Sequence, residues 1–160
     1  MDKLWAPWRI TYVQGKKKNG CIFCRAKRPG IKKDFVLFKT KRSLAMLNIF
    51  PYNNGHLMVA PLRHVRDISL LDNEEVLDLF KSLNRAKALL QKVLSPDGYN
   101  IGINVSRTAG AGIPGHLHIH IVPRWNGDTN FMPVLNNTKI ISQSLEELYK
   151  RLKACKSSKE

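Results

Sequence analysis

The stretch that most constrains the fold of this chain runs from His116 to Val122, because histidine alternates there with apolar residues. Successive side chains of a β-strand point to opposite faces of the sheet. The pattern therefore predicts a strand over residues 116–122 that ends at Pro123, with three imidazoles on one face and apolar side chains on the other. A chain with such a strand must bury one side of a sheet and keep the other side for polar groups.

Short apolar runs bounded by turn residues predict further strands over residues 35–38, 43–47, 55–60 and 99–105. The longest helical pattern runs from 72 to about 94, where Asp72 and Glu75 have the spacing of a capping box. Apolar residues at the helical period predict its buried stripe, namely Val76, Leu79, Phe80, Leu83, Leu90 and Leu94.

A last helix is predicted from about Ser144 to Ala154, and it also opens with a capping box, formed by Ser144 and Glu147. Strands precede and follow one long helix without regular strand-helix alternation. This order favours an α+β fold built on a mainly antiparallel sheet over a parallel doubly wound sheet.

At 160 residues the chain fits one domain. We divide it into an irregular N-terminal arm (1–34), a core (35–125) and a C-terminal extension with a helix (126–160). Apolar residues make up 43% of the chain, and no run approaches the roughly 18 apolar residues that a membrane-spanning helix needs. The start lacks the apolar stretch of a secretion signal, so we expect a cytoplasmic protein without a membrane partner.

The formal net charge is +15, from 27 Lys and Arg against 12 Asp and Glu. Such a field attracts polyanions, including nucleotides and nucleic acids, but charge alone does not choose between them. The basic residues are dispersed apart from Lys16–Lys18 and the run 150–153, which is typical of a solvated surface. Some of them can also steer phosphate groups.

Three of the five histidines fall in the alternating segment. Neutral imidazole is nucleophilic near pH 7, and its phosphoramidate is labile enough to transfer again. The pattern therefore indicates attack on phosphorus by the central His118, with flanking rings that donate to phosphate or the leaving group. The alternatives are a polar strand that faces solvent and an accidental metal site.

The segment 116–122 resembles the histidine-triad motif of the HIT superfamily, a family of nucleotidyl hydrolases and transferases. The resemblance covers most of residues 21–125, including the run 55–61, and it implies a HIT-like fold with a five-stranded sheet. By motif position, His118 is similar to the nucleophile that becomes nucleotidylated. His120 and His56 resemble its phosphate-contacting partners.

The same resemblance implies that Asn48 contacts the ribose and that Asn104 lines the phosphate site. The N-terminal run 4–9 with Tyr12, together with residues 122–134, further resembles the diadenosine tetraphosphate phosphorylase branch of the family. The alternative for Trp5, Trp8 and Trp125 is that they cover the sheet or a subunit contact.

One departure from the family pattern lies just before the triad. Many relatives have Gln four residues before the first histidine and Ser or Thr three before it, but this chain has Gly112 and Ile113. Backbone N–H groups of residues 110–115, with Gly112 and Gly115 among them, can bind phosphate instead. A phosphorolytic enzyme that admits inorganic phosphate as second nucleophile is compatible with this change.

Cys21 and Cys24 have the two-residue gap that lets two thiolates hold one Zn²⁺. The alternative is a pair of buried core cysteines. Several relatives complete such a site with the histidines that correspond to His64 and His116. The resemblance therefore implies a closed, structural Cys₂His₂ zinc site.

The sequence thus predicts an enzyme, a homodimer by family resemblance, that cleaves a dinucleoside polyphosphate such as diadenosine tetraphosphate through a nucleotidyl-His118 intermediate. Hydrolysis and phosphorolysis stay open. The alternatives are a purine nucleoside phosphoramidase and a non-catalytic module that binds nucleotides or nucleic acid.

Overall fold

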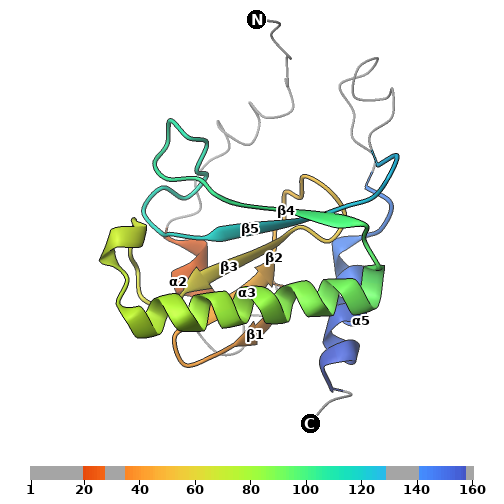
Figure 1. Ribbon diagram of the computed structural model, residues 1–160, viewed down its shortest axis with the longest axis horizontal. Helices are drawn as coiled ribbons and strands as arrows, with labels where there is room; N and C mark the ends of the chain where they lie inside the picture. The colour runs from red at the N-terminus through yellow and green to blue at the C-terminus, as the bar shows by residue number, and fades with distance from the viewer. Residues whose placement is uncertain (1–19, 28–34, 129–140, 158–160) are drawn as a thin grey trace, which may run out of the picture.

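A computed structural model describes residues 20–27, 35–128 and 141–157. These residues contain a five-stranded sheet in the order β1-β2-β3-β5-β4, and all neighbouring strands are antiparallel (Figure 1). The strands are β1 (Val36–Lys39), β2 (Ser43–Leu47), β3 (Leu57–Pro61), β4 (Gly98–Ile103) and β5 (Ile119–Arg124). The predicted α+β class with an antiparallel sheet is confirmed.

The described helices are α2 (Ile22–Ala26), the 3₁₀ turn η2 (Ile68–Leu70), α3 (Asn73–Leu94) and α5 (Leu145–Ser157). The long helix α3 runs across one face of the sheet, and α5 packs against α3 and β1 (Figure 1). The short helix α2 packs on the opposite face. Among the described helices, none is both long and apolar enough to span a membrane.

The two faces of the sheet pack into two different apolar clusters. Along β2, Ala45 and Leu47 belong to the larger cluster beneath α3 and α5, whereas Leu44 and Met46 belong to the smaller cluster with α2. This alternation is the two-residue period of a strand. On β5, Ile119 and Ile121 fill the α3 side, which leaves the His120 side chain on the α2 side.

Strand β5 differs from its prediction at both ends, because it begins at Ile119 and continues through Pro123 to Arg124. The carbonyl of Pro123 accepts a hydrogen bond from Asn53 Nδ2 (3.0 Å), on the side away from β4. The N–H and C=O groups of one strand residue point to the same side. The missing N–H of Pro123 therefore lies beyond the pairing with β3, and no ladder hydrogen bond is lost.

The capping box of α3 is confirmed: Asp72 accepts from the Glu75 N–H (2.7 Å), and Glu75 accepts from the Asp72 N–H (3.1 Å). At the last helix, Ser144 Oγ accepts from the Glu147 N–H (3.2 Å). Its boundaries differ from the prediction, because α5 extends to Ser157.

The predicted buried stripe of α3 is correct only in part. Leu79, Leu83 and Leu90 are buried, but Val76 and Phe80 are 37% and 53% exposed. Their places on the buried face are taken by Glu75, Ser82 and Ala86. Small or hydrogen-bonded side chains at these positions allow the helix to lie close to the sheet. A search for apolar residues at the helical period does not detect such positions.

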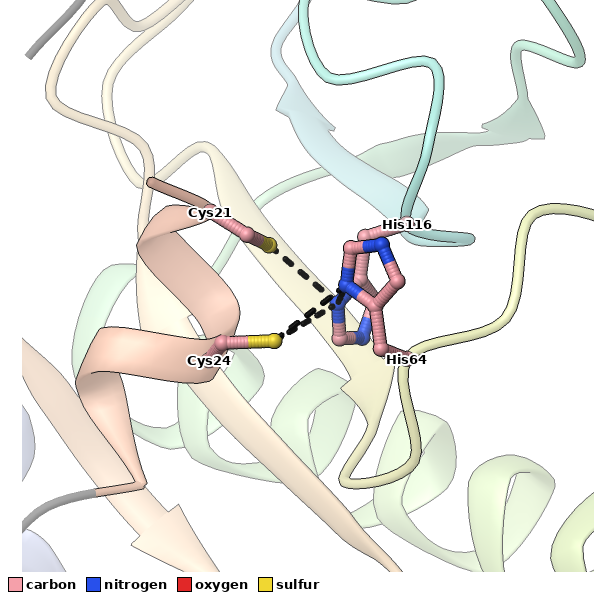
Figure 2. Close-up of side chains that lie close together, drawn as sticks. All are labelled: Cys21, Cys24, His64 and His116. Atoms are coloured by element: carbon pink, nitrogen blue, oxygen red, sulfur yellow. Dashed lines mark hydrogen bonds between the residues drawn. The ribbon is translucent and has the colours of Figure 1, made fainter. Parts of the chain in front are cut away.

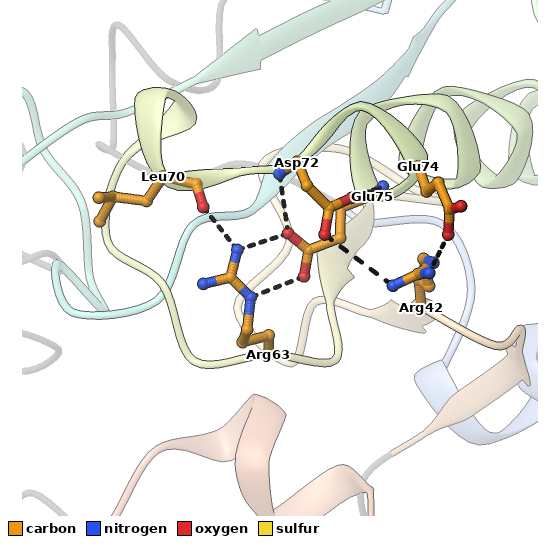
Figure 3. Close-up of polar contacts among 6 residues, drawn as sticks. All are labelled: Arg42, Arg63, Leu70, Asp72, Glu74 and Glu75. Atoms are coloured by element: carbon orange, nitrogen blue, oxygen red, sulfur yellow. Dashed lines mark hydrogen bonds and ion pairs between the residues drawn. The ribbon is translucent and has the colours of Figure 1, made fainter.

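Buried Glu75 also ties α3 to the end of β3 (Figure 3). Arg63 donates to both carboxylate oxygens (2.8 and 2.5 Å) and to the Leu70 carbonyl (2.5 Å). These bonds with Arg63 hold the pKa of Glu75 near 2, so the carboxylate stays charged at neutral pH. Arg42, which directly precedes β2, forms an ion pair with Glu74. The connection that carries His64 is therefore anchored at its start and at its end.

Candidate functional site

The three alternating histidines lie on the α2 side of the sheet, but only His120 is within strand β5. His116 and His118 belong to the segment that leads into the strand, so the prediction of a strand over 116–122 is wrong at its first three residues. All three side chains are nevertheless buried. The rings of His118 and His120 are 4.8 Å apart, and that of His116 turns toward His64.

The ring of His118 is oriented by its own backbone neighbourhood. Its Nδ1–H donates to the carbonyl of His116 (2.8 Å). A neutral imidazole carries one proton, so this bond leaves a free lone pair on Nε2. Burial lowers the pKa of His118 below its ordinary value, which keeps the ring neutral at pH 7. The side chain that the sequence places at the centre of the chemistry thus presents a nucleophilic nitrogen.

His56 and His120 form a second ring pair, with His56 Nε2 2.8 Å from His120 Nδ1. The backbone N–H of Tyr52 donates to Nδ1 of His56 (3.0 Å), so the proton of neutral His56 resides on Nε2. That proton is donated to His120 Nδ1. The proton of His120 must then reside on its own Nε2, which makes this atom a hydrogen-bond donor beside His118.

Asn48 follows β2 and lies beside the same pair. Its Nδ2 is 3.3 Å from His56 Nδ1, and its Oδ1 accepts from the Phe50 N–H (2.9 Å). Burial and the neighbouring His120 and His118 rings hold the pKa of His56 at about 3. Burial, followed by His118, holds that of His120 at about 4. The rings of His56, His118 and His120 are therefore all neutral in the resting protein.

These low pKa values predict a loss of stability at mildly acidic pH. An unfolded histidine binds a proton near pH 6.5, whereas folded His56 does so only near pH 3. The unfolded chain thus takes up more protons between these values, and folding becomes less favourable as pH falls from 7 to 5. Thermal unfolding measured across this range should show the decline, and it should be shallower in His56→Gln, which lacks the titrating ring. Equal slopes in both proteins would contradict this assignment.

The remaining histidines, His64 and His116, lie beside Cys24 of α2 and Cys21, which directly precedes that helix (Figure 2). Cys21 Sγ lies 3.2 Å from His116 Nδ1, and Cys24 Sγ lies 3.2 Å from His64 Nδ1. The two Nδ1 atoms are 3.2 Å apart, and all four donor atoms fall within 4.8 Å of one another. A tetrahedral zinc site has ligand–ligand edges of about 3.3 to 3.8 Å. Three of the separations, at 3.2 Å each, are close to this range, and the four donor types are those that zinc prefers.

A second observation supports a metal at this cluster. His116 Nε2–H donates to the carbonyl of Pro61 at the end of β3 (2.9 Å). This bond leaves the lone pair on Nδ1, the nitrogen that faces the cysteines. Metal-binding histidines commonly fix their other ring nitrogen in this way. All four residues that the sequence predicted for the metal are brought together.

The loop between β4 and β5 leads into the segment that carries His116 and His118. Asn104 directly follows β4 and is half-buried, Gly112 is exposed, and a Cβ on Gly115 would lie 3.5 Å from the ring of His64. The Gly110 and Ala111 N–H groups donate to loop carbonyls at 3.0 and 3.2 Å. Contrary to the expectation for residues 110–115, these two N–H groups are therefore not available to bind phosphate.

The segment from 30 to 127, more than half of the chain, matches the family model described as HIT domain. The chain belongs to the HIT family. The expected family and fold are thus confirmed.

Two curated HIT relatives are enzymes by name. The AP-4-A phosphorylase of Mycobacterium tuberculosis is 32% identical over 156 residues, which cover 92% of this chain and 80% of that protein. The asymmetrical bis(5'-nucleosyl)-tetraphosphatase of Schizosaccharomyces pombe is 39% identical over 93 residues, 58% of this chain and 50% of that protein. The expectation that this HIT chain is an enzyme is confirmed by these relatives.

A solved HIT structure is also similar along most of its length. The Zn-bound histidine triad family protein from Mycobacterium smegmatis has a TM-score of 0.67 and 26% identity, covering 87% of this chain and 94% of that one.

Two contributors to this HIT site were missed by sequence reasoning. Tyr52 fixes the tautomer of His56 through its backbone N–H, and its ring lies 4.5 Å from that of His56. Phe23 packs on two triad rings. A backbone donor leaves no trace in residue type, but the place of Phe23 between the cysteines was a usable signal. Trp5, Trp8, Lys16–Lys18 and Tyr12 lie outside the described residues.

Proposed function

We propose that this HIT protein cleaves dinucleoside polyphosphates, with diadenosine tetraphosphate as the substrate, by phosphorolysis through a nucleotidyl-His118 intermediate. The orientation of His118 carries the proposal: its Nδ1–H is held by the His116 carbonyl, so Nε2 is free to attack phosphorus. The phosphorylase relative that aligns with 92% of the chain supports the substrate and the second nucleophile.

In the first step, Nε2 of His118 attacks the α-phosphorus of one nucleotide, and the bond to the bridging oxygen breaks. ATP leaves from diadenosine tetraphosphate. The Nε2–H of His120 is placed to donate a hydrogen bond to the leaving oxygen, and the Nε2–H of His56 holds His120 in that tautomer by donating to its Nδ1. In the second step, inorganic phosphate attacks the same phosphorus, ADP forms, and His118 recovers its lone pair.

The remaining substrate contacts follow the positions of the side chains and the loop. Asn48, at the end of β2 beside His56, would bind the ribose, and Asn104 would face the phosphate chain. The N–H groups of Gly112 and Gly115 would take the place of the missing side-chain donors of the loop. Neither N–H has a hydrogen bond recorded to another residue of the ranges 20–27, 35–128 and 141–157.

Product analysis tests the reaction. With diadenosine tetraphosphate and labelled inorganic phosphate, phosphorolysis gives ATP and ADP with the label in ADP alone. AMP plus ATP without incorporation means hydrolysis and overturns the phosphorolytic step. Turnover of an adenosine phosphoramidate but not of the dinucleotide would overturn the substrate assignment.

We further propose that Cys21, Cys24, His64 and His116 hold a structural zinc ion. The donor geometry supports this assignment. The ion would join α2 to the segment that carries the triad and would leave the attack on phosphorus to His118. When bound, the ion would have four protein ligands and no open position, so its role would be structural and not catalytic.

Metal analysis of the purified protein should find about one zinc per chain. The content should fall to background in Cys24→Ala, because three ligands rarely retain a structural ion. Cys155→Ala is the matched control, since Cys155 lies on α5 away from this cluster and should leave the zinc content unchanged. Metal-free protein with the same thermal stability as the metal-bound form would contradict the site.

We also propose a homodimer formed through the β4 edge of the sheet. Strand β4 pairs only with β5 in the described part of the chain, and Ile101 on it is 47% exposed. Ile101 is paired with Ile121, so it points to the α3 side, where Leu77 and Phe80 are also exposed. A second copy that pairs with this edge would cover unpaired backbone and apolar side chains. Light scattering should give a mass twice the chain mass of 18.3 kDa. The Ile101→Lys variant should instead show the mass of a single chain.

A further inference from the structure

Phe23 joins the metal cluster to the nucleophile without belonging to either. It lies in α2 between Cys21 and Cys24, and it is fully buried. Its ring centroid is 5.0 Å from that of His116 and 5.0 Å from that of His118, with interplanar angles of 48° and 38°. One aromatic side chain therefore contacts a predicted ligand and the predicted nucleophile at once.

The orientation of His118 requires more than its hydrogen bond. The bond from Nδ1–H to the His116 carbonyl holds one edge of the ring, but the ring can still tilt about that bond. Two rings limit the tilt: Phe23 at 5.0 Å and His120 at 4.8 Å. Because misplacement of a reacting atom by about 1 Å can cost on the order of 100-fold in rate, the wall formed by Phe23 matters for the direction of Nε2.

We propose that Phe23 is a positioning residue: its ring holds the imidazole of His118 in the attacking orientation, and it makes that orientation depend on the cysteine–histidine cluster. The inference rests on the proposed function for its kinetic consequence. It assigns a catalytic purpose to the residue inside the cysteine pair, in addition to the packing of α2 on the sheet.

The dependence on the cluster follows from the shortness of α2. A helix of five residues is not stable by itself, so its position is set by its anchors. These anchors are the two cysteines, which face His64 and His116, and the buried side chains of Phe23 and Ala26. A shift of the cysteines would move Phe23 with them, and the wall beside His118 would move as well.

The kinetic test compares two phenylalanines of the core. Phe23→Leu keeps an apolar side chain but removes the ring beside His118. Phe38→Leu is the matched control, because Phe38 is also buried but packs in the cluster beneath α3. We expect kcat to fall roughly 10- to 100-fold in Phe23→Leu, with KM changed by less than about threefold. In Phe38→Leu, kcat should stay within about twofold of the wild-type value, even where the thermal stability drops equally.

The same proteins must be assayed for zinc and for the His118 tautomer. Zinc content should be equal in both variants and the wild type. In ¹⁵N-histidine spectra of the metal-loaded proteins, His118 should carry its proton on Nδ1 in the wild type and in Phe38→Leu. In Phe23→Leu the proton should stay on Nδ1, because the ring tilts about its bond to the His116 carbonyl, but the ring resonances should shift and broaden as His118 samples more than one orientation.

An unchanged His118 ring spectrum in Phe23→Leu, an unchanged kcat, an equal loss of kcat in Phe38→Leu, or loss of zinc in Phe23→Leu would overturn the positioning role. The spectra do not depend on the substrate. If the wild-type protein does not turn over dinucleoside polyphosphates, the proposed function fails, and the spectra still decide whether Phe23 orients His118.

Discussion

Replacing His118 with alanine should reduce turnover of diadenosine tetraphosphate by on the order of 10⁴- to 10⁶-fold, the range seen when a covalent nucleophile is removed. The reason is geometric. In the described part of the chain, His118 is the triad histidine whose Nε2 carries an unshared lone pair, because His120 holds its proton there and His56 donates its own to His120. Neither neighbour can replace it without a change of tautomer.

A second variant separates nucleophilicity from structure. In His118→Asn the side-chain amide can still donate to the His116 carbonyl, so the segment before β5 should keep its conformation. Both variants should bind nucleotide with an affinity close to that of the wild type, measured by calorimetry. Turnover within about tenfold of the wild-type rate in either variant would refute the covalent role.

The wild-type enzyme should also form an adduct that both variants lack. Substrate labelled at the α-phosphate, mixed with enzyme in the absence of inorganic phosphate and quenched at alkaline pH, should leave label on His118. Label on His120 or His56 would transfer the nucleophilic role to that residue.

The sequence was sufficient to place the alternating histidines on one face because its signal is local. Alternation of histidine with apolar residues specifies which side chains share a face, and it holds although only His120 is hydrogen-bonded into the strand. The start of β5 was not predictable in the same way. The pairing of β5 begins at Ile119, opposite Val59 of β3 and Ile103 at the end of β4, and that limit is set by other parts of the chain.

The buried face of α3 shows the same limit from the other direction. Apolar periodicity placed Val76 and Phe80 inside, yet both are exposed, and polar Glu75 is buried because Arg63 from the end of β3 pairs with it. A salt bridge between distant segments can outweigh one apolar position, and no local pattern reports it. The cysteine–histidine cluster, in contrast, could be predicted from spacing and family resemblance, since each of its members is a distinctive residue type.

The exposed apolar residues that periodicity assigned to the core acquire a use in the proposed dimer. Phe80 would be buried against a second copy, as the sequence suggested, but between chains rather than within one. The apolar stripe of α3 is wider than the face that the sheet covers, and the dimer would explain the excess. Light scattering of Ile101→Lys therefore tests this explanation as well.

The largest loss of stability is expected for Gly55→Ala, at the residue that immediately precedes His56. Gly55 has a φ of +77°, a conformation that costs a residue with a Cβ about 1 to 2 kcal/mol. A Cβ there would also lie 2.6 Å from Leu94 Cδ1, 3.0 Å from Pro123 Cγ and 3.2 Å from Leu90 Cδ2. Leu94 can shift, but Leu90 is fully buried and the proline ring is rigid, which adds about 1 to 3 kcal/mol.

We therefore expect Gly55→Ala to unfold about 10 °C below the wild type, from a total near 3 kcal/mol. Gly127→Ala is the matched control, because Gly127 has nearly the same φ (+76°) and an added Cβ would meet nothing within 4 Å. It should lose only the backbone contribution, roughly a third to two thirds of the effect. The difference between the two melting temperatures measures the steric cost of packing a Cβ at Gly55 against α3 and β5, next to His56. Equal losses would mean that the turn is free to move, and the fixed tautomer of His56 would then lack its structural support.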